Sequence, residues 1–139
     1  PHETAVAVGH LIFGGVIERF PSIRFCVAHG GGTVAALLGR WQHGFATARP
    51  GVDLKLVPPA SVVRRLAVDC LVHHSGAAAL AADVFGLDQV VFGSDWPFPM
   101  GLLNPHEQLG GLPSTLRQSI FAKRPDDLAP VSFPTTSSR

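Results

Sequence analysis

The sequence predicts an α/β fold built on a parallel sheet, and three observations support this prediction. Short apolar runs rich in β-formers occupy residues 24–28, 66–72 and 89–92. These runs begin about 40 and about 25 residues apart, the spacing of parallel strands joined by crossover helices. The segments between them carry apolar residues at helical spacing. The expected order is therefore helix, strand, helix, strand, helix, strand, helix.

The first part of the chain is expected to contain two helices around one strand. Apolar residues at helical spacing predict a helix over residues 3–20. Within it, Gly14–Gly15 is interpreted as a point of close packing against a sheet, not as a hinge. The strand at residues 24–28 is apolar almost throughout, so we expect both of its faces to be buried. A helix follows over residues 33–45, and the proline-containing stretch 46–59 is expected to be a loop.

The second part is expected to continue the alternation. A short helix over residues 60–65 precedes the second strand. Ser75 is a favourable N-cap and predicts a helix over residues 76–85 after that strand. The third strand is followed by a proline-containing loop, and we expect one or two polar helices within residues 105–122.

Composition limits the size of the fold and its partners. The 139 residues suit one domain, expected over residues 1–122, with a poorly ordered tail over residues 123–139. The net charge is +1 and no Lys/Arg cluster is present, so we expect no nucleic-acid partner. No apolar run approaches the roughly 18 residues of a membrane span, so we expect no membrane partner. Cys26 and Cys70 lie in apolar strand-like runs, which predicts reduced, buried thiols in a cytoplasmic protein.

The sequence also has the composition of a core with little surface. It is 46% hydrophobic and 15% charged, whereas soluble domains have about 25% charged residues. The first residue is Pro1, not methionine. We therefore expect this chain to be part of a longer protein.

Polar residues follow the end of each predicted strand. His29 follows the first strand, His73 and His74 follow the second, and Asp95 follows the third. Parallel α/β folds place their sites at this edge of the sheet. Asp95 offers a hard oxygen to a divalent metal, and His29 is able to bind metal or transfer a proton near neutral pH. The alternative is that His29 is a core histidine and Asp95 a turn former.

The glycines after His29 are also typical of two other kinds of site, an oxyanion loop and a P-loop. Residues 29–32, His-Gly-Gly-Gly, resemble the oxyanion loop of lipase-like hydrolases, but the Gly-x-Ser-x-Gly nucleophile motif is absent. No Gly-Lys-Ser or Gly-Lys-Thr follows the glycines, which excludes a P-loop. His73 and His74 are adjacent, so on an extended strand they face opposite ways and do not readily share a metal. Trp96 is a candidate wall of a substrate pocket, although aromatic residues beside prolines are as often simple packing.

The motifs together resemble one known family. They are Glu3-Thr4, Ala28-His29-Gly30-Gly31-Gly32, Gly39-Arg40, Arg49-Pro50 and Gly93-Ser94-Asp95-Trp96-Pro97-Phe98-Pro99. In this order they resemble the C-terminal portion of the amidohydrolase-related family typified by aminocarboxymuconate semialdehyde decarboxylase. The resemblance covers about residues 1–101. It implies the C-terminal part, about three βα units, of a metal-dependent (β/α)₈ TIM-type barrel, because 139 residues are too few to close a barrel of about 250.

The resemblance also implies roles for individual residues. Asp95 would be a metal ligand, His29 the catalytic acid/base, and Arg40 a substrate-binding residue. Trp96, the candidate pocket wall, is a further predicted substrate-binding residue. Arg40 would hold a substrate carboxylate across a homodimer interface. The resemblance implies a divalent metal, usually zinc in this family. The ligand set in this chain would be incomplete, because no His-x-His pair is present.

The expected parent reaction is decarboxylation of a small unsaturated or aromatic carboxylic acid, by a metal-dependent carboxy-lyase. Two alternatives stay open. One is metal-dependent hydrolysis of a C–N, ester or lactone bond, which uses the same metal-bound water. The other is a non-catalytic, truncated remnant. The isolated chain is expected to be inactive, because a zinc site normally needs three or four protein ligands.

Overall fold

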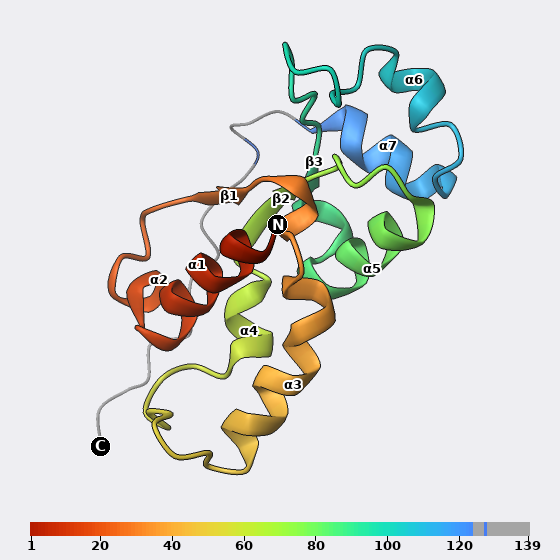
Figure 1. Ribbon diagram of the computed structural model, residues 1–139. Helices are drawn as coiled ribbons and strands as arrows, with labels where there is room; N and C mark the ends of the chain where they lie inside the picture. Colours follow the sequence, from red (N-terminus) through yellow and green to blue (C-terminus); the bar gives the residue numbers. More distant parts are fainter. Residues whose placement is uncertain (124–126, 128–139) are drawn as a thin grey trace.

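The protein contains a small parallel sheet at its centre (Figure 1). The computed structural model describes residues 1–123 and 127. The strands are β1 (Phe25–Val27), β2 (Leu66–Asp69) and β3 (Val90–Val91), in the order β1-β2-β3. Both pairings are parallel, so the predicted parallel sheet is confirmed.

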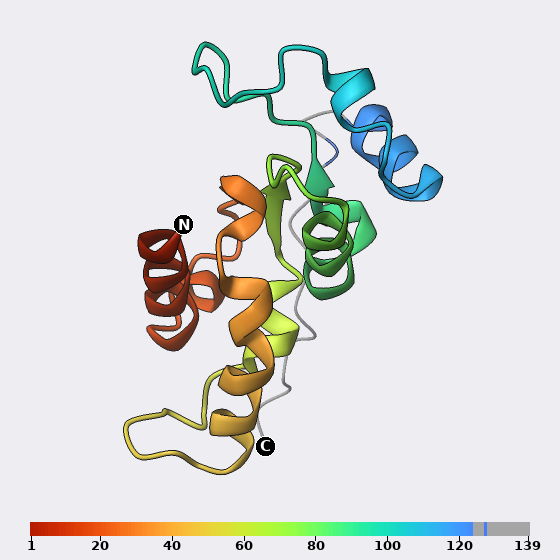
Figure 2. The ribbon, with the colours of Figure 1, turned by 45° about the vertical axis from the view of Figure 1, so that its right-hand side comes forward.

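The central strand is the best buried of the three. In β2, Leu66 and Val68 are fully buried. Figure 2 shows α1 (His2–Phe13) and α5 (Ser75–Phe85) on opposite sides of this strand. The apolar side chains of β2 alternate between these two sides, so both of its faces are covered.

Burial of the first strand differs from the prediction. Phe25 and Val27 are only partly buried and Cys26 is exposed, so the expectation of two buried faces and a buried Cys26 is wrong. The physical reason is position, because β1 is an edge strand, which pairs with β2 and with no other described strand. Cys70 is buried, as predicted, and both thiols are free.

The predicted first helix is two helices. The chain forms α1 and then α2 (Val16–Arg19), with a break at Gly15, whose φ is 65°. The interpretation of Gly14–Gly15 as packing without a hinge is therefore wrong in part. Close packing is present, since a Cβ on Gly15 would lie 2.8 Å from Leu56 Cδ2, but Leu56 belongs to the loop before α4 and not to the predicted sheet.

The remaining helices match the expected order. They are α3 (Val34–Ala46), α4 (Pro59–Val63), α6 (Pro105–Gln108) and α7 (Ser114–Ala122), with short 3-10 turns η1 (His29–Gly31) and η2 (Leu87–Gln89).

One predicted cap is wrong. His74, not Ser75, is the N-cap of α5, and its Nδ1 accepts a hydrogen bond from the Gly76 N–H at 3.1 Å. An imidazole nitrogen replaces the expected hydroxyl because the helix begins one residue earlier than predicted.

A single cluster of apolar side chains joins the sheet to its helices. Its largest fully buried members are Phe85, Ile12, Ile17, Leu66, Leu116 and Ile120. Within the described residues, no helix combines the length and apolar character needed to cross a membrane. Of the predicted tail, residues 124–126 and 128–139 lie outside the described part. Lys123 lies inside it and donates a hydrogen bond to the Asp88 carbonyl at 2.7 Å.

Candidate functional site

The chain leaves β1 through a left-handed turn that begins at His29. His29 and the three following glycines all have positive φ, from 58° at His29 to 77° at Gly31. Side chains at these glycines would collide with the fold. A Cβ on Gly30 would overlap the Val72 side chain, and one on Gly31 would lie 2.6 Å from Phe85 Cζ. The glycines therefore allow His29 to stand at the end of the strand with the chain folded tightly behind it.

The chain leaves β3 through a second tight turn that carries Asp95. The Asp95 carbonyl accepts a hydrogen bond from the Phe98 N–H at 2.9 Å. Ser94 fixes both ends of the loop, since its Oγ accepts from the Trp96 N–H at 3.2 Å and its carbonyl accepts from the Leu102 N–H at 2.7 Å. This network holds Asp95 at the mouth of the sheet without help from a regular element.

His29 and Asp95 line one pocket of about 640 Å³ at the carboxyl end of the sheet. His73, from the end of β2, lines it too. The other lining residues are mainly apolar: Pro1, Gly32, Thr33, Leu71, Val72, Ala77, Phe98, Pro99 and Met100. Strands far apart in sequence thus bring two imidazoles and one carboxylate to one cavity.

These three residues share an unusual backbone conformation. The φ angles of His29, His73 and Asp95 are 58°, 53° and 57°. Positive φ is uncommon for residues other than glycine and is stabilised only where the surrounding structure imposes it. Its recurrence at three strand ends that face one pocket marks this edge as the candidate site, because such strain gathers at functional sites.

The side chains of the pocket suit proton transfer and the binding of one hard cation. Imidazole is a side chain that acts as a general acid or base, and a carboxylate such as that of Asp95 is a hard oxygen ligand. Among the described residues, no group of three or more His, Cys, Asp and Glu side chains gathers where it could hold a metal ion. The side chains described here therefore do not complete a zinc site, and Asp95 fits one as a single ligand.

Two predicted site residues lie outside this pocket. Arg40 lies on α3 and lines a different pocket, of about 470 Å³, together with Trp41, Arg49 and Pro50. Trp96 does not line the His29 pocket, and 77% of its surface is exposed. Their predicted roles in binding substrate stay predictions.

His73 lines the pocket although the sequence pattern did not favour it. An extended strand through His73 and His74 is wrong, because β2 ends at Asp69 and His73 has positive φ. The alternation of side chains along a strand therefore does not apply to the pair. His74 caps α5 and His73 lines the pocket. Its position after a parallel strand was the signal that could have identified it.

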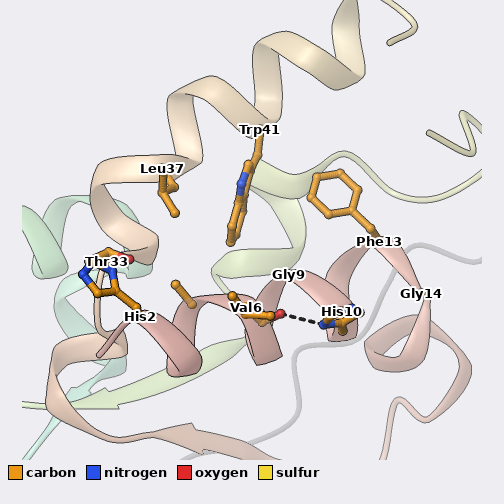
Figure 3. A pocket seen from close by; sticks show the side chains of 10 residues that line it. His2, Val6, Gly9, His10, Phe13, Gly14, Thr33, Leu37 and Trp41 are labelled. Atoms are coloured by element: carbon orange, nitrogen blue, oxygen red, sulfur yellow. Dashed lines mark hydrogen bonds between the residues drawn. The ribbon is translucent and has the colours of Figure 1, made fainter. Parts of the chain in front are cut away.

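A pocket of about 670 Å³ lies between α1 and α3 (Figure 3). Apolar side chains such as Val6, Phe13 and Trp41 line it, and Phe13 packs edge-to-face on Trp41 at 5.8 Å between ring centroids. Its two imidazoles are His2 and His10, and His10 Nδ1 is hydrogen-bonded to the Val6 carbonyl at 2.9 Å. No carboxylate lines this pocket.

Comparison with known proteins identifies the family. The sequence profile described as amidohydrolase matches residues 1–125. The chain belongs to the amidohydrolase family. Within this family it is 40% identical, over 107 residues, to 2-amino-3-carboxymuconate-6-semialdehyde decarboxylase of Dictyostelium discoideum, and 36% identical, over 105 residues, to that of Caenorhabditis elegans. These matches cover 76% and 74% of this chain, but only 30% and 26% of the relatives.

Solved structures of amidohydrolase-type decarboxylases share the fold. The 5-carboxyvanillate decarboxylase of Sphingomonas paucimobilis matches 85% of this chain and 33% of its own, with a TM-score of 0.61 and 25% identity. The apo form of IDCase from Metarhizium anisopliae matches 86% of this chain and 32% of its own, with a TM-score of 0.59 and 26% identity. The prediction of three βα units of a TIM-type barrel is thus confirmed, and the chain spans about a third of these relatives.

Proposed function

We propose that this chain forms the proton-transfer edge of a decarboxylase that acts on a small unsaturated or aromatic carboxylic acid. The observation that carries the proposal is the shared pocket of His29 and Asp95 at the carboxyl end of a parallel sheet. Family membership supports it, because relatives at 36–40% identity are decarboxylases by name.

His29 is the proposed catalytic acid/base. Replacement of a carboxyl group by hydrogen requires a proton donor beside the carbon that loses CO₂, and an imidazole supplies one near neutral pH. The turn of residues 29–32 fixes the backbone of His29 at the strand end, beside the pocket. The apolar walls from Leu71, Val72 and Phe98 suit a flat unsaturated substrate.

Asp95 is the proposed contributor of one ligand to a divalent-metal site, with zinc as the metal. Its carboxylate has the required chemistry, but the described residues do not supply the three or four protein ligands of a usual zinc site. The remaining ligands therefore have to come from outside these residues.

Arg40 and Trp96 keep their predicted roles in substrate binding. Arg40 lies on α3 beside a different pocket, which agrees with a guanidinium that serves a neighbouring subunit in a homodimer. A guanidinium is suited to a substrate carboxylate because it donates two parallel hydrogen bonds.

A chimeric enzyme tests the proposal. In it, this chain replaces the matching third of the Dictyostelium decarboxylase, and release of CO₂ from 2-amino-3-carboxymuconate semialdehyde is measured. We expect an active chimera that loses activity in His29→Ala and loses both metal and activity in Asp95→Ala. The unaltered Dictyostelium enzyme is the control for the assay.

The same assay separates the alternatives. The chain is also 32% identical, over 92 residues, to 2-keto-4-carboxy-3-hexenedioate hydratase of Sphingobium. Addition of water to a double bond without release of CO₂ would favour hydration, and turnover of an ester or lactone would favour hydrolysis. A folded, metal-loaded chimera inactive in every assay would contradict the proposal.

A further inference from the structure

The carboxylate of Asp69 joins the ends of two strands. Asp69 is the last residue of the central strand β2. Its Oδ1 accepts a hydrogen bond from the Gly30 N–H at 2.9 Å and another from the Leu71 N–H at 3.1 Å. Gly30 is the residue directly after His29, and it is 39 residues from Asp69 in sequence.

The Asp69 side chain links the two segments just beyond the last backbone pairing of β1 and β2. The β1–β2 register ends at Val27 opposite Val68. The chain then turns at His29 and its backbone no longer pairs with β2. The bond from Gly30 to Asp69 is the next link between the two segments, so the carboxylate holds the first glycine of the turn against the central strand.

The third strand end packs on the same residue. Asp69 lies opposite Val91 in the β2–β3 register. A Cβ on Gly93 would lie 2.8 Å from Asp69 Cβ and 3.5 Å from its Oδ2, so the chain two residues before Asp95 passes directly over Asp69. The Cys70 Sγ also donates a weak hydrogen bond to the Gly93 carbonyl at 3.8 Å.

We propose that Asp69 is a positioning residue that sets the placement of His29 relative to Asp95. Its carboxylate fixes the turn that presents His29, and its contact with Gly93 fixes the approach of the segment that presents Asp95. Its importance for catalysis rests on the proposed function, whereas its effect on the geometry of the turn does not.

A purely local role makes a different prediction. The Leu71 bond alone would make Asp69 an ordinary Asx turn, in which a carboxylate accepts from the N–H two residues on. Asp53 forms such a turn, because its Oδ1 accepts from the Lys55 N–H at 2.9 Å. Asp53→Ala is therefore the matched control, since it removes the same local bond without a link between strands.

The experiment measures the turn directly by NMR in the full chain. In Asp69→Ala we expect the Gly30 amide to exchange with solvent about five- to tenfold faster, because one hydrogen bond is lost. We also expect the HN–Hα coupling of His29 to change, because its φ angle relaxes. Asp69→Asn retains an acceptor oxygen and is expected to keep both values near wild type. Asp53→Ala is expected to leave both unchanged.

A second variant tests the same link without removing the carboxylate. In Gly93→Ala the new methyl group displaces the Asp69 side chain, so Gly30 exchange is expected to rise even though residue 93 is not its hydrogen-bond partner. Unchanged Gly30 exchange in both Asp69→Ala and Gly93→Ala would overturn the proposal. An equal rise in Asp53→Ala would also overturn it, because the effect would then be general loosening.

The chimera supplies the catalytic readout. There, Asp69→Ala is expected to lower kcat more than it raises KM, and Asp69→Asn to restore kcat. A folded, metal-loaded wild-type chimera that is inactive in every assay would contradict the proposed function alone, because the exchange measurements need neither substrate nor metal. Wild-type kcat in Asp69→Ala would overturn the positioning role.

Discussion

Two pockets of nearly equal volume lie in this molecule, and they differ in what lines them. The pocket at the sheet end measures about 640 Å³ and the pocket between α1 and α3 about 670 Å³. The first takes His29, His73 and Asp95 from three separate strand ends, each with positive φ. The second is lined by residues of α1 and α3, by Gly14 after α1 and by Thr33 before α3. The candidate site is therefore distinguished by titratable side chains that meet in one pocket from residues with strained backbones. Pocket volume does not distinguish it.

The largest expected effect is a difference in activity between variants of one histidine from each pocket, His29 and His10. In the chimera, His29→Gln is expected to lower kcat/KM by about 10²- to 10⁴-fold, because general acid–base catalysis contributes that much. His10→Gln, in the α1–α3 pocket, is expected to leave kcat/KM unchanged. Steady-state CO₂ release checks both, and similar losses in the two variants would remove the distinction between the pockets.

The next effect concerns the glycine turn beside the sheet-end pocket. Gly31→Ala is expected to destabilise the chain by about 2–4 kcal/mol, because it combines a left-handed residue with overpacking against Phe85. The control is Gly39→Ala on α3, where a Cβ meets nothing within 4 Å and a gain of roughly 0.5–1 kcal/mol is expected. Urea unfolding measures both. A neutral Gly31→Ala would show that the turn tolerates side chains.

The α1–α3 pocket is expected to respond in stability alone. Trp41→Ala removes the edge-to-face contact with Phe13 and part of the apolar packing, which should cost about 2 kcal/mol for a partly buried aromatic residue. Chemical denaturation measures this loss. Release of CO₂ by the folded chimera should persist. Because Trp41 also lines the pocket of Arg40, a fall in kcat/KM without loss of structure would point to that neighbouring pocket.

The smallest expected effect is on the pH dependence of folding stability in the alkaline range. Burial raises the pKa of the Cys70 thiol above its ordinary value of 9.0, with Asp69 as a further, smaller cause. Because the pKa of the Cys70 thiol is higher in the folded state, the stabilisation is fully present at pH values below the ordinary pKa. It is lost as the pH rises through the pKa of the folded state. The wild-type chain should therefore lose stability more steeply than Cys70→Ala above pH 9. Parallel unfolding curves for the two proteins would contradict this expectation.

Sequence patterns predicted the sheet well and its surroundings less well. The apolar runs and their spacing were sufficient for three parallel strands, because that spacing is typical of crossover connections. The exposure of Cys26 was not predictable, since apolar character does not tell whether a strand has one neighbour or two. The break at Gly15 was also missed, because glycine permits a helix end and close packing equally.

The sequence by itself determined the order of elements and the position of His29 and Asp95 just after strands. Both follow from local properties, namely side-chain periodicity and the glycines and prolines that end each element. Only the tertiary structure decided that His73 joins the same pocket, that Arg40 lies elsewhere, and that Asp69 binds the turn after another strand. Contacts between residues tens of positions apart depend on how the strands pack, and a local sequence pattern does not specify which distant residues meet in space.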